Sequence, residues 1–180
     1  SANLDYGIEE EIRPYAATSK DRYSLAMDEL SQPTPAVKLK RFENLNEMTG
    51  GFRSNEFSIL CGQTGTGKTT LCANISKDLL EQNIPHFVAS VETGDTDYMK
   101  RVVSSFEKKD WNNGDEVGLE DLKGFHKNFG HHMQTENMWL SLYDNRFSVK
   151  TLMSDIAWMV KHHGIKMAII DNLNFFLEVT

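Results

Sequence analysis

Apolar residues recur along the chain with two different periods. Short runs that are apolar and rich in β-branched or aromatic side chains predict four β-strands, at residues 57–61, 86–91, 139–143 and 166–171. Apolar positions spaced three or four residues apart predict helices between these strands, at residues 70–80, 95–106, 119–128 and 148–163. Because strands alternate with helices, we expect an α/β fold with a mainly parallel central sheet flanked by helices.

The first 36 residues are predicted to form an arm that is distinct from this α/β domain. Residues 1–18 are mixed and acidic and show neither period. Residues 19–31 predict a short amphipathic linker helix, and its apolar stripe consists of Tyr23, Ala26, Met27 and Leu30. The proline-containing segment that follows breaks the helix. We therefore expect a second domain over residues 37–180, with the arm packed either on that domain or on a neighbouring subunit.

A glycine-rich segment joins the first predicted strand to the helix that follows it. Its residues fit the phosphate-binding pattern G-x-x-x-x-G-K-[ST] without mismatch: Gly62, Gln63, Thr64, Gly65, Thr66, Gly67, Lys68, Thr69 and Thr70. The glycines allow backbone angles that a Cβ disfavours, so that successive N–H groups can face a phosphate. Lys68 is expected to reach the β- and γ-phosphates, and the Thr69 hydroxyl is expected to bind Mg²⁺. The pattern therefore predicts a site for a nucleotide with Mg²⁺.

Composition and charge narrow the class of protein. The 180 residues are 39% hydrophobic and 25% charged, which is typical of a globular domain, and no apolar run approaches a membrane span. The formal net charge of -7 argues against a general nucleic-acid-binding surface, so that any DNA contact would be local. The two cysteines, Cys61 and Cys72, are expected to be reduced and structural, at positions where small buried residues are useful. No signal or Arg-rich transit segment opens the chain, which favours the cytoplasm and leaves the mitochondrial matrix open.

The residues that precede the phosphate-binding pattern carry a resemblance to a known family. Phe42 and Leu45 are followed by Thr-Gly-Gly-Phe at residues 49–52, then by Glu56 and the first apolar run. This order resembles the start of the RecA-like core of DnaB-family replicative DNA helicases, most closely those of the mitochondrial Twinkle and phage primase-helicase type. The resemblance extends from Phe42 to the C-terminus and implies a RecA-like ATPase core.

Two carboxylates at predicted strand ends complete the expected site. Glu92 follows the strand at residues 86–91, at the sheet edge where α/β proteins hold ligands. The resemblance implies that Glu92 is the catalytic base that polarises the attacking water, with Lys68 neutralising the phosphates. Asp171 ends the strand at residues 166–171, which is the Walker B form, and is expected to hold Mg²⁺.

The resemblance also implies a function and partners. It implies the ATP-hydrolysing motor of a hexameric ring helicase, which moves along single-stranded DNA in replication. In that family the DNA-contacting loops, the γ-phosphate sensor and the arginine finger follow Walker B, so we expect them beyond Thr180 and the ATPase domain to be partial. Two alternatives stay open. The chain could be a RecA-like regulatory or recombination ATPase, or a nucleotide-binding interaction module without turnover.

Overall fold

The computed structural model of the protein describes most of the chain. The described residues are 18–31, 36–54, 56–91, 93–107, 109, 111, 117–143 and 147–172. Backbone contacts divide the chain into two compact units, residues 1–35 and residues 36–180. The first unit contains α1 (Ser19–Ser31), a helix with exposed apolar side chains that include Tyr23 and Leu30. None of the helices in the described ranges is both long and apolar enough to cross a membrane.

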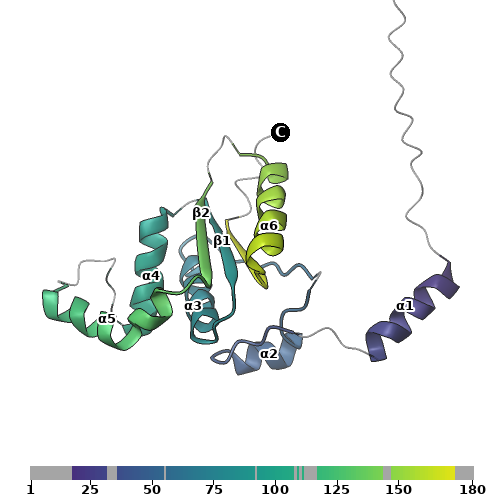
Figure 1. Cartoon of the computed structure of the whole chain (residues 1–180), viewed down its shortest axis with the longest axis horizontal. Coiled ribbons are helices and arrows are strands. Elements are labelled where there is room, and N and C mark those ends of the chain that lie inside the picture. Colours follow the sequence, from purple (N-terminus) through teal and green to yellow (C-terminus); the bar gives the residue numbers. More distant parts are fainter. Residues whose placement is uncertain are drawn as a thin grey trace, which may run out of the picture. The chain divides into compact units, whose positions relative to one another are not determined.

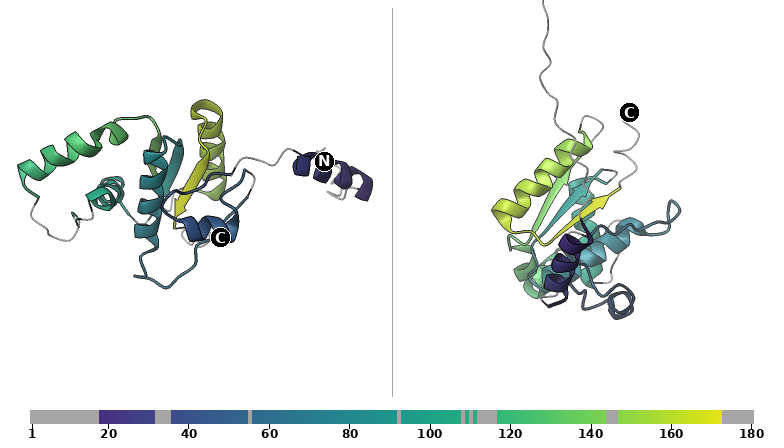
Figure 2. Two further views of the ribbon diagram at one scale, coloured as in Figure 1. Left: turned by 90° about the horizontal axis from the view of Figure 1, so that it is seen from below. Right: turned by 90° about the vertical axis from the view of Figure 1, so that its right-hand side faces the viewer.

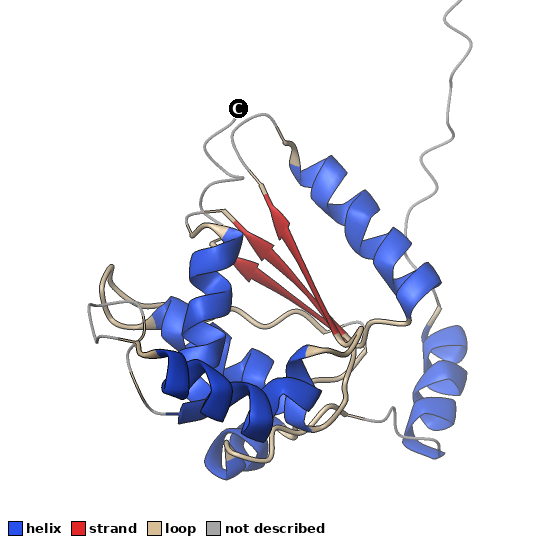
Figure 3. Cartoon of the chain, turned by 60° about the vertical axis from the view of Figure 1, so that its left-hand side comes forward, coloured by secondary structure: helices blue, strands red, loops and turns tan. Residues whose placement is uncertain are grey.

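The second unit is built on a three-stranded parallel sheet. The strands are β1 (His86–Ser90), β2 (Met138–Leu142) and β3 (Met167–Asp171), in the spatial order β2-β1-β3. β1 pairs in parallel with both neighbours, so that Ser90 lies opposite Leu142 on one side and Asp171 on the other. All three carboxyl ends therefore meet at one edge of the sheet (Figure 3). The expected parallel α/β fold is confirmed.

The helices agree with the predicted periodicity. They are α2 (Glu43–Thr49), α3 (Lys68–Glu81), α4 (Asp95–Glu107), α5 (Leu119–Met133) and α6 (Val149–His163). Two of them end at a glycine in the left-handed region, Gly50 with φ 75° and Gly164 with φ 62°, as expected for a helix C-terminus. α5 extends to Met133, beyond the predicted end at residue 128, because Phe129 and Met133 continue the apolar spacing from Phe125 and pack against the core.

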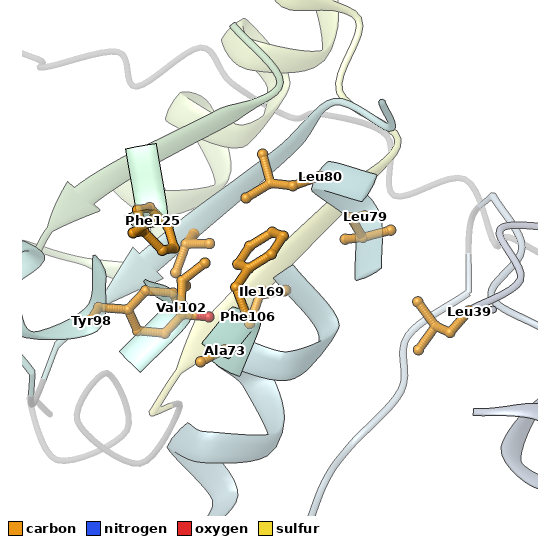
Figure 4. Close-up of a cluster of buried hydrophobic side chains, with 10 residues drawn as sticks. Leu39, Ala73, Leu79, Leu80, Tyr98, Val102, Phe106, Phe125 and Ile169 are labelled. Carbon is orange, nitrogen blue, oxygen red and sulfur yellow. The ribbon is translucent and has the colours of Figure 1, made fainter. Parts of the chain in front are cut away.

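Helices cover both faces of the sheet (Figures 1 and 2). On one face, Val88 and Ile169 pack against apolar side chains of α3, α4 and α5 (Figure 4). On the other face, Phe87 and Ala89 pack against Leu152 and Met159 of α6. Successive residues of a strand point to opposite faces, which is why neighbours along β1 belong to different clusters. By the same alternation Asp171, two residues after Ile169, lies on the face that α3 and α4 cover.

A buried carboxylate near the end of α3 holds the segment that precedes α2. Asp78 is 1% exposed, and it accepts hydrogen bonds from the backbone N–H groups of Lys40 at 3.0 Å and Arg41 at 2.7 Å. The Arg41 guanidinium makes a bidentate ion pair with Glu81, with N···O distances of 2.8 and 2.7 Å. Hydrogen bonds to a buried charge stabilise more than neutral ones, so these contacts fix residues 40–41 on α3.

The prediction of a strand at residues 57–61 is wrong. This segment makes no strand pairing, and Phe57, Ile59 and Leu60 are 69%, 67% and 50% exposed. Cys61 is also exposed, contrary to the expected burial, whereas Cys72 is half-buried, and both thiols are unbridged. A strand requires a neighbour for its backbone groups, which an apolar composition does not supply. In the described part of the sheet β3 is an edge strand, and its outer side carries no such pairing.

We predict that His86 makes stability sensitive to mild acid. His86 is fully buried at the start of β1, and burial lowers its pKa from 6.5 to about 4. The unfolded chain therefore binds a proton below about pH 6.5 that the folded chain does not accept until about pH 4. The free energy of unfolding should fall by roughly 2–3 kcal/mol as the pH drops through this window.

Urea unfolding at several pH values would measure this dependence. The His86→Phe variant keeps a buried ring and removes the titrating group, so its profile should be flatter between pH 6.5 and pH 4.5. An unchanged slope in this variant would assign the acid sensitivity to other groups.

Candidate nucleotide-binding site

The phosphate-binding pattern forms a loop that ends at the N-terminus of α3. Gly65 and Gly67 have φ angles of 81° and 93°, a region that favours glycine, and Gly67 is the N-cap of α3. Residues 62–67 are exposed, while Lys68, Thr69 and Thr70 form the first turn of the helix. The first N–H groups of a helix have no intrahelical acceptor and carry partial positive charge. The loop is thus accessible to solvent and suited to an anion.

The Lys68 side chain folds back over the loop that precedes it. Its Nζ donates hydrogen bonds to the carbonyl oxygens of Gly62 and Gln63, each at 2.8 Å. Thr66 closes the same turn, because its hydroxyl donates to the Gln63 carbonyl at 2.7 Å. The ammonium group is therefore held at the mouth of the loop by two neutral acceptors. A phosphate oxygen would be a stronger acceptor than either carbonyl, since its hydrogen bond to an ammonium joins two charges.

Asp171 lies at the end of β3, where it is 5% exposed. It lies on the sheet face that α3 covers, and it is close enough to influence Cys72 on that helix. Burial raises the pKa of the Cys72 thiol to about 12, and the nearby Asp171 carboxylate adds to the effect. Cys72 is one turn from Thr69, on the same side of α3. The fold therefore brings the carboxylate and the Thr69 hydroxyl to the same region of the protein.

The residues in this region fit a magnesium ion. Mg²⁺ prefers oxygen ligands and is usually held by one or two protein oxygens together with phosphates and water. Thr69 supplies a hydroxyl from the first turn of α3, next to the phosphate loop, and Asp171 supplies a carboxylate from the end of β3. This donor set suits Mg²⁺ bound together with a nucleotide and would be poor for a metal without one.

Glu92, the expected catalytic base, lies outside the described residues. The residues that flank it are described. Val91 donates its backbone N–H to the Asp171 carbonyl at 2.8 Å, and the Ser90 hydroxyl donates to the Thr93 carbonyl. The chain on both sides of Glu92 is thus attached to the sheet edge where β1 and β3 end.

The sequence interpretation missed a buried polar pair next to these residues. The hydroxyls of Ser76 on α3 and Tyr98 on α4 are 3.2 Å apart, and both side chains are 0% exposed. The apolar spacing that predicts α4 did not include Tyr98 in the apolar face of the helix. The spacing of Ser76 could have indicated its position, because it is seven residues after Thr69 and so falls on the same side of the helix.

One comparison with known proteins bears on this site. The family model described as the DnaB-like helicase C terminal domain matches residues 39–179. The match spans the sheet, the phosphate loop and Asp171, and it starts after the unit that contains α1. It agrees with the parallel α/β architecture and confirms the resemblance to the RecA-like core of DnaB-family helicases. The chain belongs to the DnaB-like helicase C-terminal domain family.

Proposed function

We propose that the chain is the ATP-binding and ATP-hydrolysing motor core of a ring-forming replicative DNA helicase. In this proposal, hydrolysis between neighbouring subunits drives movement along single-stranded DNA. The observation that carries it is the phosphate loop at the N-terminus of α3, with Lys68 at its mouth and Asp171 at the adjoining sheet edge. Family membership supports it, since DnaB-like helicases use ATP with Mg²⁺. The Twinkle-like assignment is the finer part of the proposal. It is supported by the run Ile169-Ile170-Asp171-Asn172-Leu173, which resembles the Twinkle form of the Walker B motif.

Each site residue has a separate part in the proposed reaction. The loop N–H groups and Lys68 bind the phosphates, and Thr69 and Asp171 hold Mg²⁺, which neutralises charge on the phosphates when it is bound. Glu92 orients the attacking water and accepts its proton. An arginine from the neighbouring subunit would stabilise the negative charge that develops on the γ-phosphate. Turnover would therefore depend on assembly.

Lys68→Ala is predicted to weaken ATP binding strongly while the fold is retained. Within the described ranges, the Lys68 ammonium group donates hydrogen bonds to the carbonyls of Gly62 and Gln63, so the side chain is expected to contribute charge to phosphates and little to the core. Affinity for ATP should fall by about 100-fold, the size expected from losing charged hydrogen bonds to the phosphates. Equilibrium binding measures the affinity for ATP, and thermal melting shows whether the fold is retained. Lys161→Ala, at an exposed position on α6, is the matched control and should bind as the wild type does. Equal affinity in both variants would remove the loop from the proposed site.

Glu92→Gln is predicted to separate binding from chemistry. The amide keeps the size of the side chain and cannot accept the proton of water. The variant should retain Mg²⁺-ATP and lose hydrolysis by about 100-fold, the scale of general-base effects. Single-turnover hydrolysis in the full-length protein is the measurement. The exposed Glu136→Gln serves as the control for the charge change. Normal hydrolysis by Glu92→Gln would assign the base to another carboxylate.

The unit that contains α1 is proposed to hold neighbouring subunits together. Tyr23, Met27 and Leu30 of its apolar stripe are 67%, 46% and 76% exposed. Burying such a stripe contributes a few kcal/mol, which is enough to matter for assembly and too little to hold a dimer alone at low concentration. Hexamer formation is general in this family, which supports the same role.

Deletion of residues 1–36 is predicted to shift the protein towards monomer while ATP binding survives. Light scattering over a range of concentrations measures the mass distribution of both proteins. Tyr23→Ser with Leu30→Ser, which keeps the arm and removes its apolar contacts, should give a shift in the same direction. An unchanged distribution in the deletion variant would show that α1 packs on its own chain.

A further inference from the structure

The pair formed by Ser76 and Tyr98 lies in apolar surroundings. Tyr98 belongs to the buried cluster that also contains Ala73, Val102 and Ile169 (Figure 4). Burying a hydroxyl in such a place is unfavourable unless it is hydrogen-bonded. A phenylalanine would fill the same volume without that requirement. The hydroxyl is therefore paired with Ser76 at a location where packing alone does not call for a polar group.

The pair connects two elements that bound the candidate nucleotide site. Ser76 lies seven residues after Thr69 on α3, on the same side of the helix and about 10 Å further along its axis. Tyr98 lies in the first turn of α4, and its backbone N–H donates to the Gly94 carbonyl at 2.8 Å. Since α3 moves as a rigid rod over this length, a contact at Ser76 also limits the position of Thr69.

Asp171 lies close to the same pair. It shares its sheet face with Ile169, which packs in the cluster that contains Tyr98. Burial raises the pKa of Tyr98 above its ordinary value, and the nearby Asp171 carboxylate adds to the effect. Tyr98 is therefore a neutral hydroxyl at neutral pH and keeps its proton for a hydrogen bond. Its ring belongs to the same buried cluster as Ile169 of β3, and its hydroxyl contacts Ser76 of α3. α3 and β3 are the two elements that carry the candidate magnesium ligands.

We propose that Tyr98 is a positioning residue for the magnesium end of the nucleotide site. Through its hydrogen bond with Ser76 it holds the Thr69 side of α3 at a set distance from Asp171 on β3. This inference rests on the proposed nucleotide function and adds a residue to it. Tyr98 itself touches neither metal nor nucleotide in this proposal, and it acts only through the placement of Thr69 and Asp171.

The test is the effect of Mg²⁺ on nucleotide affinity in the full-length protein. The dissociation constant of a fluorescent ATP analogue is measured with EDTA and with saturating Mg²⁺, and the ratio of the two is the magnesium enhancement. Tyr98→Phe should lower this enhancement by about three- to tenfold, the effect of one hydrogen bond, while affinity in EDTA stays at the wild-type value. Ser76→Ala should do the same, and the double variant should be no worse than either single one, because both remove one contact.

Tyr143→Phe is the matched control. Tyr143 is also buried, and its hydroxyl donates to Asp155 at 2.6 Å, in the cluster on the opposite face of the sheet. This variant also loses one tyrosine hydrogen bond, in this case to a carboxylate, and should keep the wild-type magnesium enhancement. Thr69→Ala, which removes a candidate ligand, should lower the enhancement.

The outcomes separate the inference from the function on which it rests. If Thr69→Ala lowers the enhancement and Tyr98→Phe does not, the positioning role is wrong and the nucleotide site stands. If Tyr98→Phe lowers affinity equally with and without Mg²⁺, the contact only supports the fold and the inference is also wrong. A wild-type protein that binds no nucleotide would overturn both.

Discussion

The parallel pairing of β1 with both of its neighbours is the constraint on which the rest of the structure depends. A parallel connection must return to the starting edge of the sheet, and helices make that crossing over one face or the other. The same pairing aligns Ser90 and Asp171 at one edge. The proposed nucleotide site lies at this edge, where β3 ends with Asp171.

α3 links this edge to the opposite side of the unit. Its first turn carries the phosphate loop and Lys68, and its last turns carry Asp78 and Glu81, which hold residues 40–41. A helix of 14 residues is stiff, so contacts at its two ends are not independent. The segment that follows the arm is thus anchored on the helix that carries the candidate phosphate loop. In a ring helicase this arrangement would connect the attachment of a subunit to its nucleotide site.

The polar side chains inside this unit differ in what they contribute. Asp78 accepts hydrogen bonds from backbone donors and stabilises the fold, whereas the hydroxyls of Ser76 and Tyr98 are hydrogen-bonded to each other. Lys68 occupies the loop with contacts that a phosphate can replace without loss of hydrogen bonds. The hydrogen bonds that a phosphate could replace are in the exposed loop. The hydrogen bonds of Asp78, Ser76 and Tyr98 are in the buried interior. In the proposed function, this separation would allow the loop to bind and release a nucleotide without disturbing the core.

The sequence by itself determined the local elements and the phosphate loop. Helices such as α6 could be predicted because their signals depend on residues close together in the sequence. These signals are an apolar spacing, an N-cap at Ser148 and a C-cap at Gly164. The loop was readable because its glycines and Lys68 are needed at fixed spacing around one phosphate group. Asp171 was readable as the end of an apolar strand. Each of these signals is local, and local physical chemistry is what a sequence pattern records.

Only the tertiary structure decided which predicted elements pair and which side chains meet. Residues 57–61 have the composition of a strand but no neighbour in the described sheet, and pairing is a property of two segments. The contact between Ser76 and Tyr98 joins residues 22 apart on different helices, and no periodicity within either helix specifies it. The burial of Asp78 likewise depends on backbone donors 37 and 38 residues away. Such contacts are set by how helices pack on the sheet, which is a long-range outcome of the whole chain.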